Sequence, residues 1–285
     1  MECDLSAFMP VTATATGAEP RFLARDGGRL AYEDRGSGPL ALCLPAPGDL
    51  RAEYRFLAPL LVEAGFRVVA MDLRGHGDSS SMWSDYSVAR IGEDAMALLR
   101  HLNAGPALII GTSVAAGAAI YAAADAPGLV RGLVLIGPFV QDTWPLWQLK
   151  LLLTPLLASR WGPALWIRYY RTLYPTATPE DFELYLATLE ANLREPRRME
   201  AVRRMATASR RASEMRVPRV AAPSLVLVGS HDPEYDDPVT AAWSLADQMR
   251  ADVALAEGVG HHPQCEVPNW TADEIVAFAG EVATD

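Results

Sequence analysis

The sequence contains few cysteines and has no recognisable targeting segment. Its three cysteines, Cys3, Cys43 and Cys265, are scattered and lack metal-ligand spacing. An odd number of distant cysteines does not make a disulfide framework. Residues 1–4 are acidic where a secretory signal would be basic. We therefore expect a cytoplasmic protein with reduced thiols and no metal.

The sequence also lacks a convincing membrane-spanning run. Residues 102–124 carry no charged side chain, but they are rich in alanine and glycine. Such a stretch scores poorly as a spanning helix. It is better interpreted as a strand followed by a buried helix, so no membrane span is expected.

Positive charge is scarce, with 25 Lys and Arg against 35 Asp and Glu and a formal net charge of -10. This balance argues against nucleic acid as a partner. Residues 141–219 are an exception, with 13 basic and 8 acidic side chains. Two interpretations stay open here: solvated helix faces, or a basic lid that favours anionic substrates.

Short apolar runs alternate with helical stretches along the 285 residues. This alternation predicts an α/β fold with a mostly parallel twisted sheet of about eight strands and helices on both faces. The expected strands are a hairpin over 21–35, then 40–44, 67–71, 107–110, 129–136, 223–228 and 252–256. The expected helices span 54–64, 87–102, the residues after Ser113 to about 126, and 271–282.

Residues 141–215 interrupt this rhythm and are predicted to be helical throughout, with a helix start at Thr178-Pro179. The expected organisation is a flexible arm (1–20), a core (21–140 and 216–285) and a helical cap (141–215). The cap carries Trp144, Trp147 and Trp166, which are candidate substrate-binding residues. Its leucines either pack as core or line a pocket for an apolar substrate.

A candidate nucleophile lies where the apolar run 107–110 ends in Gly111-Thr-Ser113-Val-Ala115. A serine between small residues at a strand-to-helix turn is typical of a nucleophile elbow, because the backbone segments approach closely there. Ala115 stands where the pattern usually has glycine.

A candidate acid and base follow in order. Asp232 comes after the strand 223–228, and His261 comes after the strand 252–256. Side chains just past the carboxyl ends of parallel strands lie where sites in open α/β sheets are built. A histidine can deprotonate a serine hydroxyl, and a carboxylate can orient the imidazole. Asp142 as the acid and His262 as the base are alternatives.

From about residue 21 to the end, the chain resembles the α/β-hydrolase family, in its serine-nucleophile branch with a helical cap. Met71-Asp-Leu-Arg-Gly-His-Gly-Asp-Ser79 is similar to the loop after the family's fourth strand, and Glu266 and Pro268 follow His261 at a family spacing. The resemblance implies a Ser113–Asp232–His261 triad. It also implies cofactor-free cleavage of an ester, thioester, lactone or activated C–C bond of a small, largely hydrophobic substrate.

The sequence departs from the family at the expected oxyanion hole. One backbone N–H would come from Val114, and the other from the loop after the third strand, where Pro47 has none to give. Gly48 or Ala46 would then donate instead, or the hole has one donor, or the reaction does not need a full hole. Asp49 could reach the pocket, although surface polarity would also explain Asp49, Arg51 and Glu53.

Two further functions therefore remain beside a carboxylic ester hydrolase. One is a lyase, cyclase or cofactor-free oxygenation reaction on the same scaffold in a biosynthetic pathway, and the other is a small-molecule receptor. The sequence fixes neither the substrate nor the oligomeric state, and fold alone does not choose the reaction.

Overall fold

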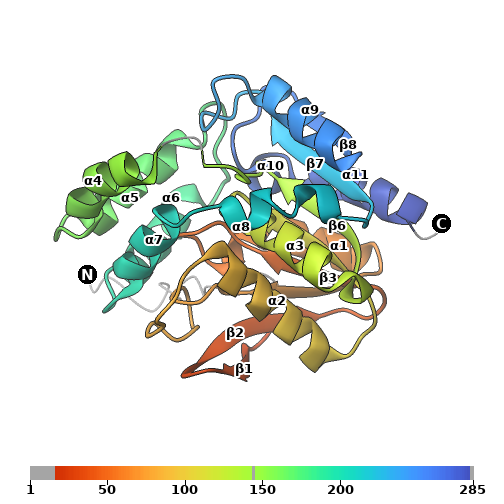
Figure 1. Cartoon of the computed structure of the whole chain (residues 1–285), viewed down its shortest axis with the longest axis horizontal. Helices are drawn as coiled ribbons and strands as arrows, with labels where there is room; N and C mark the ends of the chain where they lie inside the picture. The colour runs from red at the N-terminus through yellow and green to blue at the C-terminus, as the bar shows by residue number, and fades with distance from the viewer. Residues whose placement is uncertain (1–16, 143–144, 283–285) are drawn as a thin grey trace, which may run out of the picture.

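The computed structural model describes residues 17–142 and 145–282. Within them, eight strands form one sheet in the order β1-β2-β4-β3-β5-β6-β7-β8 (Figure 1). β1 and β2 pair antiparallel with their neighbours, and all the other pairs are parallel. The predicted fold class is confirmed. The strands are β1 (Arg21–Arg25), β2 (Gly28–Arg35), β3 (Leu40–Leu44), β4 (Arg67–Met71), β5 (Ala107–Thr112), β6 (Val130–Ile136), β7 (Ser224–Gly229) and β8 (Asp252–Ala256).

Helices cover both faces of the sheet, and each face has its own apolar core. Side chains alternate along a strand: in β3, Leu42 packs into one core while Ala41 and Cys43 pack into the other. Because both of its faces are buried, the central strand β3 is apolar throughout. The first core is covered by α2 (Val88–Leu102), α3 (Val114–Asp125) and α9 (Pro238–Met249), and the second by α1 (Leu57–Glu63) and α11 (Pro268–Val282).

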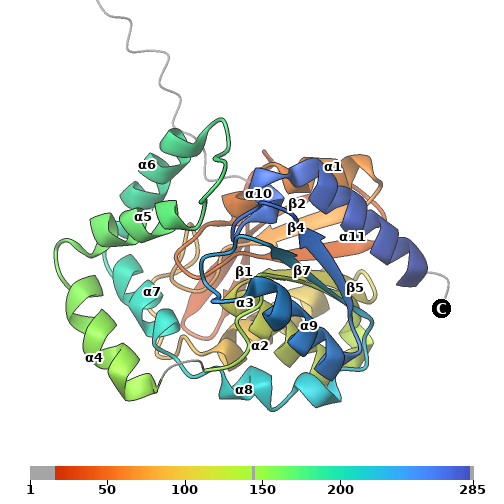
Figure 2. The ribbon, with the colours of Figure 1, turned by 90° about the horizontal axis from the view of Figure 1, so that it is seen from above.

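A helical insertion separates β6 from β7. Figure 2 shows α4 to α7 grouped at one side of the sheet, whereas α8 lies against α2 and α3. A third apolar cluster joins α5 and α6 to the core through Leu50 and Ala52. The insertion comprises α4 (Leu146–Leu157), α5 (Gly162–Thr172), α6 (Phe182–Leu193), α7 (Arg198–Ala206) and α8 (Arg211–Glu214).

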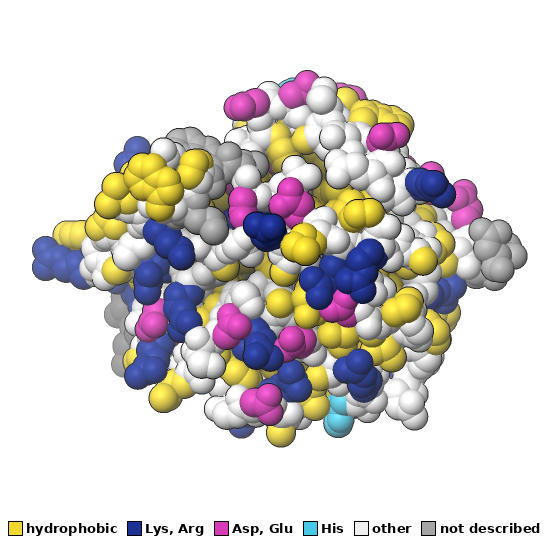
Figure 3. Space-filling model, in the orientation of Figure 1, with side chains coloured by type: hydrophobic (Ala, Val, Ile, Leu, Met, Phe, Trp, Pro, Cys, Tyr) yellow, Lys and Arg dark blue, Asp and Glu magenta, His cyan; other side chains and the backbone are white. Residues whose placement is uncertain are grey.

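One face of the insertion is apolar and open to solvent. Trp147, Leu151, Leu152 and Leu156 of α4 are all exposed, and Figure 3 shows apolar side chains gathered over this helix. In the part of the chain that the structure describes, no helix is both long and apolar enough to cross a bilayer.

The expected helix start at Thr178-Pro179 is wrong by a few residues. α6 begins at Phe182, and its N-cap residue Asp181 makes no capping hydrogen bond. The Asp181 carboxylate instead accepts two hydrogen bonds of 2.7 Å from Arg55, so a tertiary ion pair prevails over the local capping signal. The predicted apolar face of the helix is confirmed, since Phe182, Tyr185, Leu186, Leu189 and Leu193 are buried.

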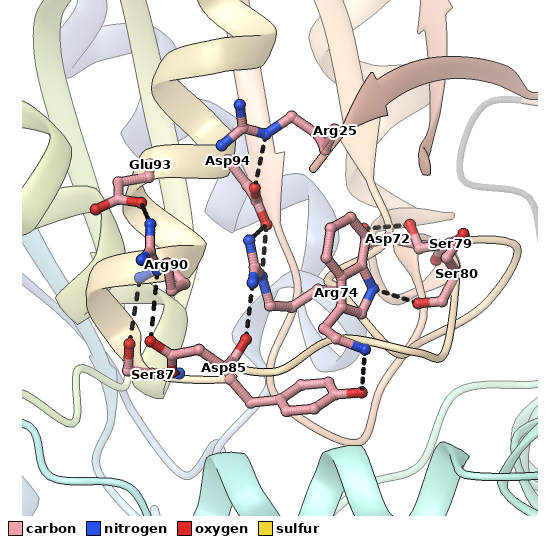
Figure 4. Close-up of polar contacts among 12 residues, drawn as sticks. Arg25, Asp72, Arg74, Ser79, Ser80, Asp85, Ser87, Arg90, Glu93 and Asp94 are labelled. Carbon is pink, nitrogen blue, oxygen red and sulfur yellow. Dashed lines mark hydrogen bonds and ion pairs between the residues drawn. The ribbon is translucent and has the colours of Figure 1, made fainter. Parts of the chain in front are cut away.

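Buried ion pairs hold the loop that follows β4 (Figure 4). Arg74 Nε donates to Asp94 Oδ2 over 2.8 Å, and its Nη1 donates to the carbonyl of Asp85 over 2.7 Å. Arg25 Nε donates to the other Asp94 oxygen over 3.0 Å. The hairpin, α2 and this loop are therefore tied together, and the loop carries His76 toward the carboxyl ends of the strands.

Surface polarity is the wrong explanation for Asp49, Arg51 and Glu53, because all three are buried. Arg51 Nε donates to Glu33 over 2.6 Å, and Arg51 Nη1 contacts Asp72 and lies 2.8 Å from Asp78. Arg51 is only 2% exposed, so these carboxylates, rather than water, stabilise its positive charge.

Replacing Arg51 with methionine is expected to lower the free energy of unfolding by about 3–5 kcal/mol, because two buried carboxylates lose their cation. Urea denaturation would measure the loss. Arg171→Met removes an ion pair with Glu183 that is exposed on both sides, and it should change stability little. Equal midpoints for the two variants would contradict this account.

Candidate active site

Ser113 lies in a strained turn between β5 and α3. Its φ of 56° and ψ of -124° are unusual for a non-glycine residue. The Ser113 N–H donates to the Ile136 carbonyl over 2.8 Å, which fixes the turn at the carboxyl end of the sheet. A Cβ at Gly111 would lie 2.8 Å from the Ala115 carbonyl oxygen. The small residues of the motif are therefore required by backbone contact.

Asp232 and His261 lie in contact just beyond β7 and β8. Asp232 Oδ2 is 2.6 Å from His261 Nδ1, and both side chains are buried. Burial by itself would lower the pKa of His261, but the Asp232 charge more than offsets this and raises the pKa to about 9. The pair therefore holds a proton on the imidazole more tightly than a free histidine does.

The two alternatives for acid and base have other partners. Asp142 accepts hydrogen bonds from Ser209 Oγ over 2.8 Å and from the Arg210 N–H over 2.9 Å. His262 Nδ1 lies 3.1 Å from the Gln264 amide nitrogen. Asp232, rather than Asp142, is the carboxylate that meets His261.

Ser113 and His261 line the same cavity, which has a volume of about 80 Å³. Val114, the first residue of α3, also lines it. The fold therefore brings a serine, an imidazole and a helix N-terminus from distant segments to one cavity. The remaining lining residues are Ala46, Pro47, Phe139, Trp166, Tyr169, Tyr170, Leu173, Ala206, Arg210, Glu234 and His262.

The two loop residues expected to replace Pro47 as hydrogen-bond donors are already engaged. The Ala46 N–H donates to Glu53 Oε2 over 2.7 Å. The Gly48 N–H donates to His76 Nε2 over 2.8 Å. Burial lowers the pKa of His76 to about 4, so its imidazole stays neutral and accepts this bond. The expectation that Ala46 or Gly48 offers a free N–H is wrong.

The candidate substrate-binding residues do not all line the cavity. Trp166 lines the cavity, and its Nε1 donates to the Gly48 carbonyl over 3.1 Å. Trp147 is 66% exposed and does not line this cavity, so the expectation is wrong for this side chain. Asp49 is fully buried and does not line this cavity, so the expectation that it reaches the pocket is wrong. Trp144 lies outside the described residues.

Asp49 belongs to a buried acidic group beside the site. It accepts hydrogen bonds from Tyr170 and Tyr185, and burial raises its pKa. Burial and the neighbouring Asp49 charge also raise the pKa of Glu53 to about 8. Asp49, Glu53 and His262 could each offer a metal ligand atom, all within 4.8 Å of one another. Both carboxylates already accept protein hydrogen bonds.

A larger cavity of about 540 Å³ shares part of its wall with the first. Phe139, Trp166, Tyr169, Ala206, Arg210 and Glu234 line both. Its other lining residues are Asp142, Leu149, Leu152, Leu153, Leu156, Leu157 and Leu165. The leucines of the insertion therefore line a pocket, which was one of the two interpretations of the sequence.

Sequence reasoning missed Ala206, Arg210 and Glu234. Glu234 had a signal, because it lies two residues after Asp232 in the same loop. Ala206 and Arg210 had none, because no local pattern distinguishes them from the other alanines and arginines of the insertion.

Comparisons with known proteins agree with this architecture. A family model described as alpha/beta hydrolase fold matches residues 42–266. The chain is 33% identical over 132 residues to 2-(acetamidomethylene)succinate hydrolase of Mesorhizobium japonicum, covering 44% of this chain and 46% of that protein. It is 34% identical over 123 residues to a non-heme haloperoxidase of Rhodococcus erythropolis, covering 41% and 43%. These matches span less than half the length of either relative.

Solved structures are similar over nearly the whole chain. A thermophilic esterase from Thermogutta terrifontis has a TM-score of 0.78 at 22% identity, covering 93% of this chain and 99% of that one. The enol-lactonase from Burkholderia xenovorans has a TM-score of 0.77 at 18% identity, covering 91% and 100%. At such identities the likeness concerns the fold. With its sheet order, its elbow and a family model that matches most of its length, this chain belongs to the α/β-hydrolase fold family.

Proposed function

We propose that this protein is a serine hydrolase that cleaves a carboxylic ester or a related acyl bond through an acyl-enzyme on Ser113. One observation supports this most: Ser113 shares a cavity with His261, whose Nδ1 contacts Asp232. His261 accepts the Ser113 proton as the oxygen attacks the carbonyl carbon, and then gives the proton to the leaving group. Water repeats the cycle and releases the acid.

The proposed substrate has an uncharged, apolar acyl group. Six of the thirteen residues that line the larger cavity are leucines and three are aromatic, and its charged side chains are Asp142, Arg210 and Glu234. Arg210 Nη1 lies 3.7 Å from Asp142, so two carboxylates accompany one guanidinium. This balance offers an anion no excess positive charge, which favours solvated helix faces over a basic lid for anionic substrates.

A fluorophosphonate probe tests the proposed chemistry, because it phosphonylates only an activated serine. We expect one covalent adduct, which peptide mass spectrometry assigns to Ser113, together with hydrolysis of nitrophenyl esters. If ligands raise the melting temperature but no adduct forms, the protein is a receptor. An adduct without turnover across ester and thioester substrates would favour the non-hydrolytic reaction.

Ala206 provides a test of the substrate pocket, because it lines both cavities. In the wild-type protein, kcat/KM should rise from acetate to octanoate esters, by up to about fourfold for each buried methylene. Ala206→Phe should lower kcat/KM for octanoate at least about tenfold, because the larger side chain takes up space in which methylenes of the acyl chain would be buried. The value for acetate should change little. The matched control is Ala191→Phe on the exposed side of α6. An equal loss for both esters would contradict this assignment.

A further inference from the structure

The proposed acyl transfer needs stabilisation of the negative charge that develops on the carbonyl oxygen. One candidate donor is the Val114 N–H at the start of α3, which has no protein hydrogen-bond partner in the described ranges 17–142 and 145–282. The loop after β3 adds nothing: Pro47 has no N–H, and the N–H groups of Ala46 and Gly48 are bound elsewhere. A family member normally has two backbone donors at this position, and here a second donor would have to come from another group.

His262 has a buried polar atom without a partner. Its side chain is fully buried, and its Nε2 makes no hydrogen bond to the described part of the chain. Leaving a buried polar atom without a hydrogen bond costs free energy. Unpaired groups of this kind in a native structure call for an explanation, and a ligand that completes the bond is one.

The hydrogen bonds around His262 determine which of its nitrogens carries the proton. The Gln264 amide nitrogen lies 2.7 Å from Glu53 Oε1 and 3.1 Å from His262 Nδ1. An amide nitrogen only donates, so Nδ1 is the acceptor and the proton is on Nε2. Burial lowers the pKa of His262 well below its usual range. The imidazole is therefore a neutral donor and does not compete with His261 for the Ser113 proton.

Three neighbouring rings hold the ring of His262 in place. It stacks on Tyr174 with ring centroids 5.1 Å apart, and on Tyr170 with centroids 5.3 Å apart. The His261 ring is nearly perpendicular to it, at a centroid distance of 5.0 Å. His262 lines the same cavity of about 80 Å³ as Ser113 and Val114. Because the aromatic contacts fix the ring, its Nε2–H is ordered before the substrate arrives.

We propose that the Nε2–H of His262 is the second oxyanion donor, acting with the Val114 N–H in place of the backbone donor that Pro47 lacks. This inference rests on the proposed function. As the Ser113 oxygen bonds to the carbonyl carbon, the C=O electron pair moves to the oxygen, and His261 takes the hydroxyl proton. His262 donates a hydrogen bond throughout and transfers no proton. When the C=O bond forms again, the leaving group departs with the proton from His261.

Two substitutions at His262 test the assignment. His262→Phe keeps an aromatic ring for stacking and removes the donor, and it should lower kcat by about 10²–10³ with little change in KM. His262→Gln places an amide N–H near the position of Nε2 and should recover part of the loss. Tyr174→Phe is the matched control for packing, since it keeps the aromatic ring and removes only a hydroxyl.

Binding of a trifluoromethyl ketone separates an oxyanion donor from a structural residue. Its adduct with Ser113 carries a negative oxygen, so His262→Phe should weaken this inhibitor about as much as it lowers kcat. The affinity for the uncharged product alcohol should stay the same. In the wild-type protein, the His262 Nε2–H proton should move downfield in the NMR spectrum when the adduct forms, a measurement that needs no variant.

The outcomes distinguish this inference from the proposed function. A wild-type protein without a Ser113 adduct would overturn both. A wild-type protein that is labelled and active, but whose His262→Phe variant keeps kcat and inhibitor affinity, would overturn only the role of His262. An unchanged His262 proton resonance in the adduct would do the same.

Discussion

Replacing Ser113 with alanine is expected to lower kcat/KM for ester hydrolysis by a factor on the order of 10⁴–10⁶ and to abolish covalent labelling. Alanine removes the oxygen that forms the acyl-enzyme, and His261 then has no hydroxyl to deprotonate. A small rate above that of water should remain, because the cavity still binds substrate and still offers the Val114 N–H.

Steady-state hydrolysis of a nitrophenyl ester, together with the fluorophosphonate adduct, measures this effect. Ser244→Ala is the matched control, because Ser244 lies exposed on α9, and both rate and labelling should stay at the wild-type level. Thermal unfolding should show both variants folded. An alanine variant at 113 that keeps more than a tenth of the wild-type rate would mean that another residue is the nucleophile.

The sequence predicted those parts of the site that belong to a short motif or that directly follow a recognisable strand. Gly111 and Ser113 form a motif whose small residues follow from close backbone contact. Asp232 and His261 each follow a strand that is apolar enough to recognise. Parallel strands end at one edge of a sheet, so the order of strands alone brings these side chains toward one another.

The parts that the sequence did not predict depend on packing between distant segments. Asp49, Arg51 and Glu53 resemble a polar surface turn. The partners of Asp49 and Arg51 nevertheless come from β2, from the loop after β4, and from α5 and α6. Glu53 accepts hydrogen bonds from the Ala46 N–H and from Gln264. Trp147 and Trp166 lie on neighbouring helices and are equally apolar. Only the docking of α5 through Leu50 and Ala52 places Trp166 inward.

The same reasoning applies to the oxyanion loop. That Pro47 lacks an N–H follows from the sequence alone. That the Ala46 and Gly48 groups are also engaged follows only from the positions of Glu53 and His76. The tautomer of His262 depends in turn on Gln264, whose amide bridges Glu53 and the imidazole.

Asp232→Asn is expected to reduce kcat/KM near neutral pH by about 10⁴, although the amide has nearly the same shape as the carboxylate. Asparagine can donate to His261 Nδ1, which would leave the Nε2 position protonated and unable to accept the Ser113 proton. The substitution also removes the charge that stabilises the imidazolium during attack.

The pH dependence of kcat/KM tests the same contact independently. His261 must be neutral to act as the base, and its pKa is raised to about 9, so the wild-type rate should increase with pH and level off above about pH 9. In Asp232→Asn the carboxylate charge that raises the pKa of His261 is gone, and burial then lowers this pKa. The midpoint of the pH profile should therefore move to lower pH. Asp125→Asn, which removes a carboxylate paired with Arg216 on the far end of α3, should keep the wild-type profile. A midpoint that stays near pH 9 without the Asp232 charge would show that another carboxylate raises the pKa of the catalytic base.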